Sequence, residues 1–278
     1  MTVGTFLADA TRRLQDAGID TARLDCLVLL EDELGEDRAS LLAHLERRIT
    51  TPHLLILNKK VAQRARHMPL AYLRGKAEFY GREFIVNNQV LVPRPESEKI
   101  IDLLKLLSFG IPPKLVPLCI ADVGAGSGCL GITAALEFPG AFMDFYDIDS
   151  QALAVTLKNS NCYKLPHSTF ITGNLLANPR KILVRKYDVV LANLPYVPES
   201  YKINQAAHHE PKISLFGGED GLDLYRTFWE QIAGLESRPR FVITESFPFQ
   251  HKKSMALAKN AGYLLQATDD FAQSFKAR

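Results

Sequence analysis

Hydrophobic residues at the start of the chain recur at steps of three and four positions, the spacing of one face of an α-helix. In the first such run the apolar positions are Phe6, Leu7, Ala10 and Leu14. Gly18 follows, and glycine commonly ends helices because it readily takes the left-handed backbone conformation. Further helices are predicted over residues 22–34, 38–47 and 52–66. The pattern therefore predicts a small helical domain over residues 1–75.

The pattern changes after this helical part. Residues 78–86 place aromatic and β-branched side chains on both sides of Gly81, which predicts a β-hairpin. We assign residues 76–92 to a linker that contains this hairpin.

From residue 93 onward, short apolar runs alternate with helical stretches. Strands are predicted at 118–123, 142–147, 168–172, 187–192, 240–245, 263–268 and 273–277. Helices are predicted at 96–107, after the glycine at 128, and at 150–163, 221–235 and 250–261. This alternation predicts an α/β domain over 93–278, with a mainly parallel sheet covered by helices on both faces. Such sheets bind ligands at the carboxyl ends of their strands.

The loop after the first predicted strand of the sheet is rich in glycine. Gly124, Gly126 and Gly128 lead directly into a helix, and glycine there permits a tight turn and close approach of a ligand. Asp147 ends the next strand, roughly 20 residues further on, where an acid commonly binds the ribose hydroxyls of a cofactor. Asp149 is better placed than Asp147 to favour the start of the following helix. Nicotinamide dehydrogenases share this pattern, so it does not by itself choose the reaction.

The tetrad Asn193-Leu194-Pro195-Tyr196 ends an apolar strand. Together with the glycines and Asp147 it resembles the motif of S-adenosylmethionine-dependent methyltransferases that act on amino or amide nitrogens. Such a nitrogen is a poor nucleophile, and its N–H groups become better donors as the methyl group arrives. Two fixed acceptors therefore stabilise the transition state more than the ground state.

We expect these acceptors to be the side-chain oxygen of Asn193 and the main-chain carbonyl of Leu194. Pro195 restricts its own φ and biases the preceding residue towards extended geometry, which helps to aim that carbonyl. Tyr196 is expected to flank the planar target group.

Several stretches carry a more specific resemblance. They are 69–75 (PLAYLRG), 78–81 (EFYG), 91–98 (LVPRPESE), 209–211 (HEP) and 217–223 (GGEDGLD). With these, the chain resembles the HemK-type protein-glutamine methyltransferases, which methylate the side-chain amide of glutamine in the Gly-Gly-Gln motif of class I peptide chain release factors. The resemblance implies a Rossmann-like class I methyltransferase domain behind a small helical substrate-recognition domain and a hairpin linker. It also implies S-adenosylmethionine as cofactor and a release factor as partner.

The resemblance also implies roles for single residues. The residues that would hold the methionine end of the cofactor are Gly124, Ala125, Gly126, Ser127 and Gly128. Asp147 would hold the ribose, and Asn193 would contact both cofactor and substrate. Where the family usually has an acid followed by an aromatic residue, this chain has Asn174 and Leu175, which would contact the adenine.

On the substrate side, the resemblance gives the glutamine to the tetrad 193–196 and places Arg94 and Glu96 beside the mouth of the active site. A second interpretation of the latter pair is a proline-led helix start whose acids are favoured by the helix dipole. We keep both open.

Two alternatives compete with protein-glutamine methylation. Leucine at position 194 is familiar from rRNA adenine dimethyltransferases, which stack the target base on an aromatic residue such as Tyr196. Those enzymes carry their helical domain last rather than first, and their pattern lacks the Pro-Arg-Pro-Glu stretch. A scaffold that binds the cofactor without turnover is the third reading.

The composition adds little but excludes several classes. With 33 basic and 31 acidic residues the net charge is +2, which does not favour bulk binding to nucleic acid. The basic residues between 47 and 66 are expected to form a solvated helix face. The four cysteines lie far apart, so we expect reduced thiols and no metal site. No apolar run approaches the ~20 residues of a membrane span, and we expect a cytoplasmic, monomeric enzyme without a membrane partner.

Overall fold

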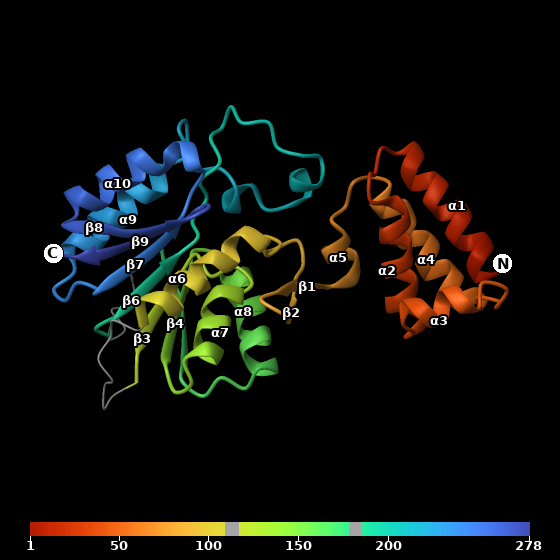
Figure 1. The fold of residues 1–278 in the computed structure, drawn as a ribbon, viewed down its shortest axis with the longest axis horizontal. Helices are drawn as coiled ribbons and strands as arrows, with labels where there is room; N and C mark the ends of the chain where they lie inside the picture. The colour runs from red at the N-terminus through yellow and green to blue at the C-terminus, as the bar shows by residue number, and fades with distance from the viewer. Residues whose placement is uncertain (109–116, 178–184) are drawn as a thin grey trace. The chain divides into compact units, whose positions relative to one another are not determined.

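The computed structural model describes residues 1–108, 117–177 and 185–278 (Figure 1). By their contacts the described residues fall into two compact units. The N-terminal unit consists of Met1–Lys76 together with Ile203–His209, and the larger unit of Ala77–Lys202 with Glu210–Arg278. The segment Ile203–His209 thus belongs with helices that precede it by more than a hundred residues, and His209 Nε2 lies 2.8 Å from the carbonyl oxygen of Arg66.

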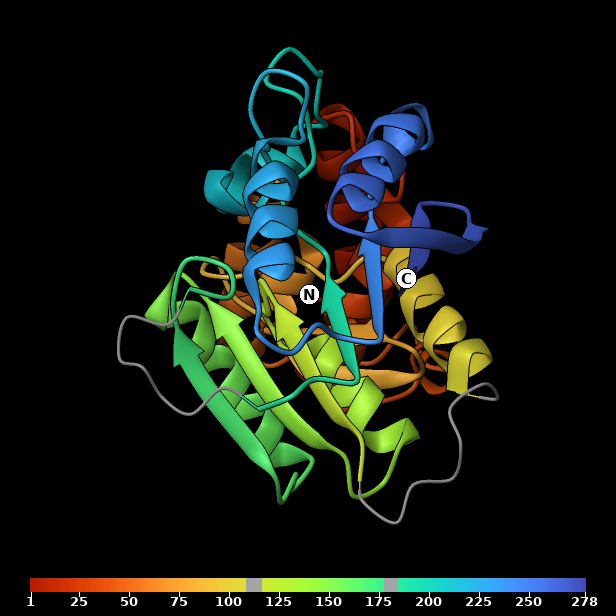
Figure 2. The same ribbon diagram turned by 90° about the vertical axis from the view of Figure 1, so that its left-hand side faces the viewer.

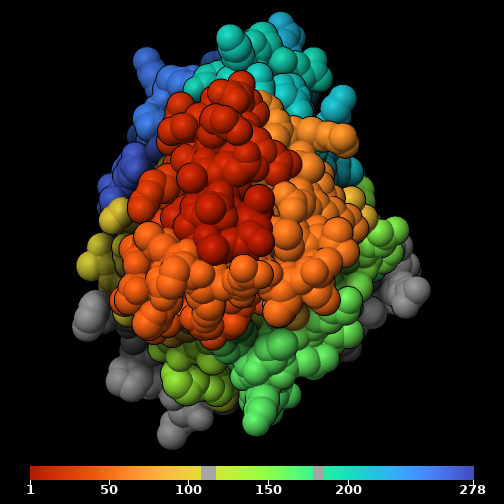
Figure 3. All heavy atoms as spheres, turned by 90° about the vertical axis from the view of Figure 1, so that its right-hand side faces the viewer, coloured from red at the N-terminus to blue at the C-terminus, as the bar shows by residue number. Residues whose placement is uncertain are grey.

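The N-terminal unit is helical, as predicted. Its helices are Val3–Asp16 (α1), Ala22–Leu34 (α2), Arg38–Ala43 (α3), Thr51–Arg64 (α4) and Leu70–Arg74 (α5). Its core combines the apolar face of α1 with α2 and α4, and Phe6, Leu14 and Leu30 are almost fully buried there. Figure 3 shows a face of this unit, with its residues in red to orange.

Two details of this unit differ from the prediction. The helix predicted over 38–47 ends at Ala43, because His44 leaves the helical conformation and the carbonyls of Leu45 and Arg47 accept from N–H groups at the start of α1. Helix α5 was not predicted from the sequence.

The basic residues between 47 and 66 were expected to be solvated, and for several of them this is wrong. They pair with acids of the same unit: Arg47 with Glu36, Lys60 with Glu33 at 3.2 Å, and Arg64 with Asp25 at 2.7 Å. These pairs neutralise charge that an RNA phosphate would otherwise meet.

The predicted hairpin, formed by Lys76–Phe79 (β1) and Arg82–Ile85 (β2), lies at the start of the larger unit. Tyr80 and Gly81 connect the strands with φ values of 53° and 69°. Two successive left-handed residues give a turn that matches the twist of the paired strands.

A seven-stranded sheet in the order β5-β4-β3-β6-β7-β9-β8 forms the centre of the larger unit. The strands are Cys119–Val123 (β3), Phe142–Asp147 (β4), Ser168–Thr172 (β5), Val189–Ala192 (β6), Phe241–Glu245 (β7), Tyr263–Asp269 (β8) and Ala272–Ala277 (β9). Strands β3 to β7 run parallel, and β9 lies antiparallel between β7 and β8. The structure confirms the predicted α/β class and a mainly parallel sheet.

Helices cover both faces of this sheet (Figure 2). The helices are Glu98–Ser108 (α6), Cys129–Glu137 (α7), Ser150–Cys162 (α8), Asp223–Gly234 (α9) and His251–Asn260 (α10). Side chains of α6, α7 and α8 pack in one core cluster, and those of α9 and α10 pack in the other. A short 3₁₀ helix, Pro95–Ser97 (η1), precedes α6 where one continuous helix was predicted.

Strand β3 lies between β4 and β6, so the chain leaves it to one side and later returns to the other. Such a reversal opens a crevice at the carboxyl ends of the strands. The ends of β3, β4, β6 and β7, with the loops after them, therefore lie where a ligand is expected.

Candidate active site

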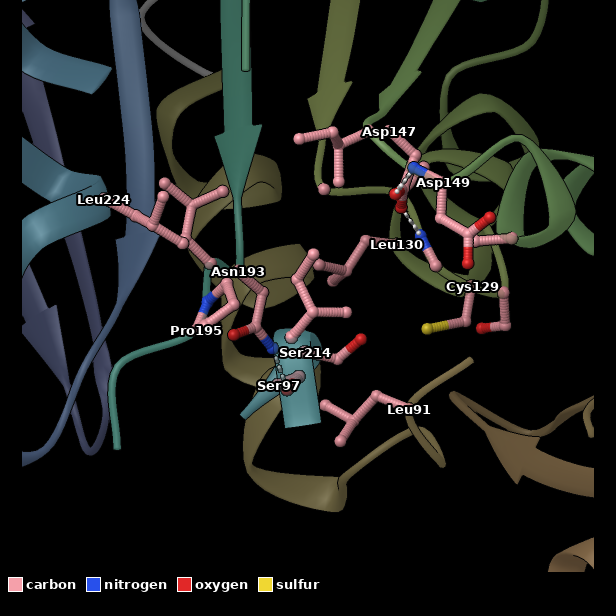
Figure 4. A pocket seen from close by; sticks show the side chains of 18 of the residues that line it. Leu91, Ser97, Cys129, Leu130, Asp147, Asp149, Asn193, Pro195, Ser214 and Leu224 are labelled. Atoms are coloured by element: carbon pink, nitrogen blue, oxygen red, sulfur yellow. Dashed lines mark hydrogen bonds between the residues drawn. The ribbon is translucent and has the colours of Figure 1, made fainter. Parts of the chain in front are cut away.

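A pocket opens at the reversal between β3 and β6 (Figure 4). Among the predicted site residues its lining includes Gly124, Ala125, Gly126, Ser127, Asp147, Asn174, Leu175, Asn193, Leu194, Pro195 and Arg94. The fold therefore brings these predicted residues from separate strands and loops to one pocket. Gly128, Tyr196 and Glu96 do not line it.

The glycine loop is held at the end of the neighbouring strand. The N–H groups of Gly124 and Ala125 both donate to the carbonyl oxygen of Tyr146, at 2.8 and 2.9 Å. Gly126 has a φ of +56°, and a Cβ added there would meet nothing within 4 Å. The loop thus presents open space beside its backbone at this position, as a bound ligand requires.

Gly128 serves packing instead. Its φ is +79°, and a Cβ there would lie 2.6 Å from Cγ2 of Thr156 on α8. The third glycine is needed because the start of α7 lies directly against the next helix.

Asp147 is fixed by two backbone groups. One carboxylate oxygen accepts from the N–H of Gly126 and the other from the N–H of Asp149, both at 2.9 Å. Burial raises the pKa of Asp147, and these hydrogen bonds oppose the shift. Each carboxylate oxygen can accept more than one hydrogen bond, so the group retains capacity for a pair of hydroxyls. The side chain of Asp149 caps α8, as predicted.

A second acid lies behind the loop. Asp122, at 1% exposure on β3, accepts from the N–H of Gly131 through Oδ2. Its Oδ1 is buried and has no hydrogen-bond partner among the described residues. Burial raises its pKa to about 7, against the hydrogen bond from Gly131 and with help from the charge of Asp147. No role was predicted for Asp122 from the sequence.

The turn that carries Asn174 and Leu175 has an unusual backbone conformation and is held by hydrogen bonds from one side chain. Leu175 has a φ of +58°, which is unusual for a branched side chain. Gln231 of α9 holds the turn from both sides: its Oε1 accepts from the N–H of Leu176 at 2.8 Å, and its Nε2 donates to the carbonyl of Asn174 at 3.2 Å. We infer that Gln231 positions this wall of the pocket.

The tetrad follows β6 directly. The side-chain Nδ2 of Asn193 donates to Oγ of Ser97 at 2.8 Å (Figure 4). The N–H of Leu194 donates to the hydroxyl of Tyr225 at 3.2 Å. Neither Oδ1 of Asn193 nor the carbonyl of Leu194 accepts a hydrogen bond from any residue that the structure describes. Both residues line the pocket, so two acceptors with free capacity are available to a ligand there.

Tyr196, which was expected to flank the target group, is held behind the pocket lining by hydrogen bonds at both its side chain and its carbonyl. Its hydroxyl donates to Oε1 of Glu245 at 2.8 Å, and its carbonyl accepts from Nε2 of Gln250 at 2.8 Å. A Cβ on Gly221 would come within 2.1 Å of that carbonyl oxygen. The GGEDGLD stretch therefore needs glycine here because it passes directly against the tetrad.

Arg94 is engaged by a buried acid. Its Nη2 lies 2.6 Å from Oε1 of Glu210, whose other oxygen accepts from the N–H of Val92 at 3.1 Å. Glu210 is 5% exposed. This pair ties the Pro-Arg-Pro-Glu stretch to the His-Glu-Pro stretch at the edge of the pocket, whereas the exposed side chain of Glu96 lies outside the lining.

Comparison with known proteins identifies the family. The PrmC N-terminal domain family matches residues 5–75, and the methyltransferase small domain family matches residues 111–210. The release factor glutamine methyltransferase of Koribacter versatilis is 34% identical over 236 residues, which cover 84% of this chain and 81% of the relative. The chain belongs to the release factor glutamine methyltransferase family. The same-named protein of Bacillus anthracis is 34% identical over 251 residues, covering 88% of this chain and 86% of its own length.

Other relatives are longer than this family member. A bifunctional methyltransferase of Rickettsia conorii is 31% identical over 244 residues, and this chain spans 46% of its length. Among solved structures, the hMettl16 catalytic domain in complex with a MAT2A 3′UTR hairpin has a TM-score of 0.51 at 14% identity, covering 84% of this chain and 85% of that one. That likeness concerns the fold alone.

Family membership makes the chain a methyltransferase with S-adenosylmethionine as cofactor, which confirms the predicted cofactor. The site fits that molecule, because the open glycine loop and the fixed Asp147 carboxylate lie at adjoining strand ends. Among the described residues no group of His, Cys, Asp and Glu could hold a metal ion. Within the same residues, none of the helices combines the length and apolar character of a membrane span.

Proposed function

We propose that this protein transfers a methyl group from S-adenosylmethionine to the side-chain amide nitrogen of the glutamine in the Gly-Gly-Gln motif of class I peptide chain release factors. The observation that carries the proposal is the pair of free acceptors, Oδ1 of Asn193 and the carbonyl of Leu194, at the pocket. The names of the curated relatives supply the substrate.

The two acceptors suit an amide nitrogen better than an oxygen or carbon nucleophile, because a primary amide has two N–H donors to place. Held by both acceptors, the nitrogen is oriented and cannot rotate away from the methyl donor. As the new N–C bond forms, the nitrogen becomes more positive and both hydrogen bonds strengthen. One amide proton then leaves to solvent, which restores the neutral secondary amide.

The residues at the ends of β3 and β4 would bind the cofactor largely through main-chain groups. When bound, S-adenosylmethionine supplies the methyl group as an electrophile. Residues 124–127 would lie against its methionine end, Asp147 would accept from its ribose hydroxyls, and Asn174 and Leu175 would adjoin the adenine. Arg94 is held by Glu210 and is placed at the entrance, where we propose that it contacts the release factor rather than the glutamine.

We propose that the enzyme acts as a monomer in the cytoplasm, where release factors act.

The direct test is incubation with cofactor labelled in the methyl group and two acceptors offered separately, a bacterial class I release factor and deproteinised rRNA. We expect label in the release factor and none in the same factor with its motif glutamine replaced by alanine. Label that enters rRNA alone would overturn the proposal in favour of adenine methylation, and label in neither would favour a binding scaffold.

A further inference from the structure

Behind the tetrad lies a buried acid that the proposed reaction does not use. Glu245 ends β7 and is 1% exposed. Its Oε1 accepts from the hydroxyl of Tyr196, and its Oε2 is buried with no hydrogen-bond partner among the described residues. Such an acceptor is costly unless a donor beside it can satisfy it.

The hydroxyl of Ser97 acts on this carboxyl and is the group that could supply such a donor. It is 2% exposed at the end of η1, and its Oγ accepts from Nδ2 of Asn193 at 2.8 Å. Burial raises the pKa of Glu245, while hydrogen bonding from Ser97, Tyr196 and Asn193 lowers it. The Ser97 hydroxyl, the Asn193 amide and the Glu245 carboxyl therefore form one buried cluster.

We propose that Glu245, acting through Ser97, is a positioning residue that fixes which end of the Asn193 amide faces the substrate. The inference rests on the proposed function and adds residues to it. An ionised carboxylate only accepts hydrogen bonds, so the serine proton points to Glu245. The serine oxygen is then left to accept from Nδ2 of Asn193, which turns Oδ1 to the pocket.

The orientation matters because an amide rotated by 180° has almost the same shape. Without the carboxylate, the Ser97 hydroxyl can donate to Oδ1 of Asn193 instead. The NH₂ group then faces the N–H of the substrate glutamine, and two donors meet where the reaction needs an acceptor. Glu245 thus determines which of Ser97 and Asn193 donates in the hydrogen bond between them, which packing alone does not determine.

The first test compares Ser97→Ala and Glu245→Gln with the wild type, using a bacterial class I release factor as substrate. Both substitutions should lower kcat on the order of 10-fold to 100-fold, while the Kd for S-adenosylmethionine changes by less than about twofold. Ser97→Thr, which keeps the hydroxyl, should recover most of the lost kcat. Ser254→Ala removes an equally buried hydroxyl on α10 and serves as the matched control.

A second variant separates the two partners of Glu245. Tyr196→Phe removes the hydroxyl that binds Oε1 but leaves Ser97 and Asn193 untouched. If Glu245 acts through Ser97, this variant loses clearly less kcat than Glu245→Gln. An equal loss in both variants would overturn the proposal and assign Glu245 to holding Tyr196.

The pH profile gives a readout that a structural role would not move. Wild-type kcat should fall as the pH is lowered through the raised pKa of Glu245, because a protonated carboxyl no longer forces the direction. The charged and titratable groups that act on Glu245 or feel its charge are Glu96, Tyr196, Tyr225 and Cys129. Asp122, with its pKa of about 7, is present in both proteins, so an acid limb that is lost only in Glu245→Gln belongs to Glu245.

A measurement without substrate keeps this inference separate from the proposed function. The side-chain NH₂ signal of Asn193, assigned by its absence in Asn193→Asp, should exchange slowly with solvent in the wild type and faster in Ser97→Ala and Glu245→Gln. Failure of the wild type to methylate the release factor would overturn the proposed function. The exchange measurement would still show whether Glu245 and Ser97 hold the Asn193 amide. Equal exchange in all three proteins, or equal kcat in Ser97→Ala and Ser254→Ala, would overturn the network.

Discussion

The two halves of the active site are built in different ways. The proposed cofactor half, at the ends of β3 and β4, consists mainly of backbone groups: the loop of Gly124 to Gly128 and the N–H groups that hold Asp147. The substrate half, at the ends of β6 and β7, consists of side chains that hold one another, with Ser97, Asn193, Tyr196 and Glu245 in one cluster. The first half depends on conformations that glycine permits, and the second on hydrogen bonds between distant parts of the chain.

The largest expected effect comes from the substrate half. Asn193→Ala removes one of the two acceptors and should lower kcat by roughly 10²–10³-fold. Cofactor affinity should survive, because the loop and Asp147 remain. Titration calorimetry and single-turnover rates measure the two quantities, with the exposed Asn260→Ala as control. A large loss of cofactor affinity would show that Asn193 belongs to the cofactor half.

A substitution in the glycine loop is expected to lower the stability of the fold. Gly128→Ala combines a strained φ with a contact to Thr156 and should destabilise the protein by about 2–3 kcal/mol. Gly140→Ala, at a φ of +88° in open space, should cost only about 1 kcal/mol. Urea unfolding measures both. Equal losses would mean that φ alone, and not packing against α8, requires the third glycine.

Asp122, which lies behind the glycine loop, should make the free energy of unfolding depend on pH. Its pKa is raised in the folded state from 3.8 to about 7, so the folded protein binds more protons than the unfolded chain between these values. This group therefore stabilises the fold least above its folded pKa, and stability should fall as the pH rises.

Asp122→Asn keeps an acceptor for Gly131 and removes the titration. Between about pH 5 and pH 8 the wild type should lose on the order of 2 kcal/mol more unfolding free energy than the variant. Urea unfolding at both pH values tests this, and parallel losses would contradict the assigned pKa.

A substitution of Gln231 tests whether the turn at 174–176, which is proposed to adjoin the adenine, affects cofactor binding alone. Gln231→Leu removes both hydrogen bonds to the turn at 174–176 and should raise the Kd for S-adenosylmethionine roughly three- to tenfold, from about 1 kcal/mol of lost hydrogen bonding. At saturating cofactor, kcat should stay near the wild-type value. A fall in kcat with unchanged Kd would place this turn in the substrate half.

The smallest expected effect is that of Leu194→Pro. The carbonyl acceptor is retained, so kcat should stay within about threefold of the wild type. The N–H that donates to Tyr225 is lost, which should cost about 1 kcal/mol of stability. Rates and urea unfolding of the same preparation test both points. A gain of many-fold in kcat would show that leucine impairs the tetrad.

The contrast also explains what the sequence could predict. The strands, the switch point, the glycine loop and Asp147 follow from local patterns, because apolar periodicity and glycine positions are read over a few residues. Even the two acceptors of the tetrad could be named, since they depend on the residues at 193 and 194 alone.

The partners of the tetrad could not be predicted. Ser97 lies 96 residues from Asn193, Glu245 lies 49 from Tyr196, and Gln231 lies 55 from Leu176. A serine beside a helix start and a glutamate at a strand end are ordinary in sequence. Only the tertiary fold places Ser97 and Glu245 against the tetrad and Gln231 against the turn at 174–176.

The most direct test of the account is mass analysis of a class I release factor after incubation with S-adenosylmethionine and either the wild type or Asn193→Ala. The account predicts that the peptide with the Gly-Gly-Gln motif gains one methyl group on its glutamine with the wild type and remains unmodified with the variant. A methyl group on another residue, or equal methylation by the variant, would contradict it.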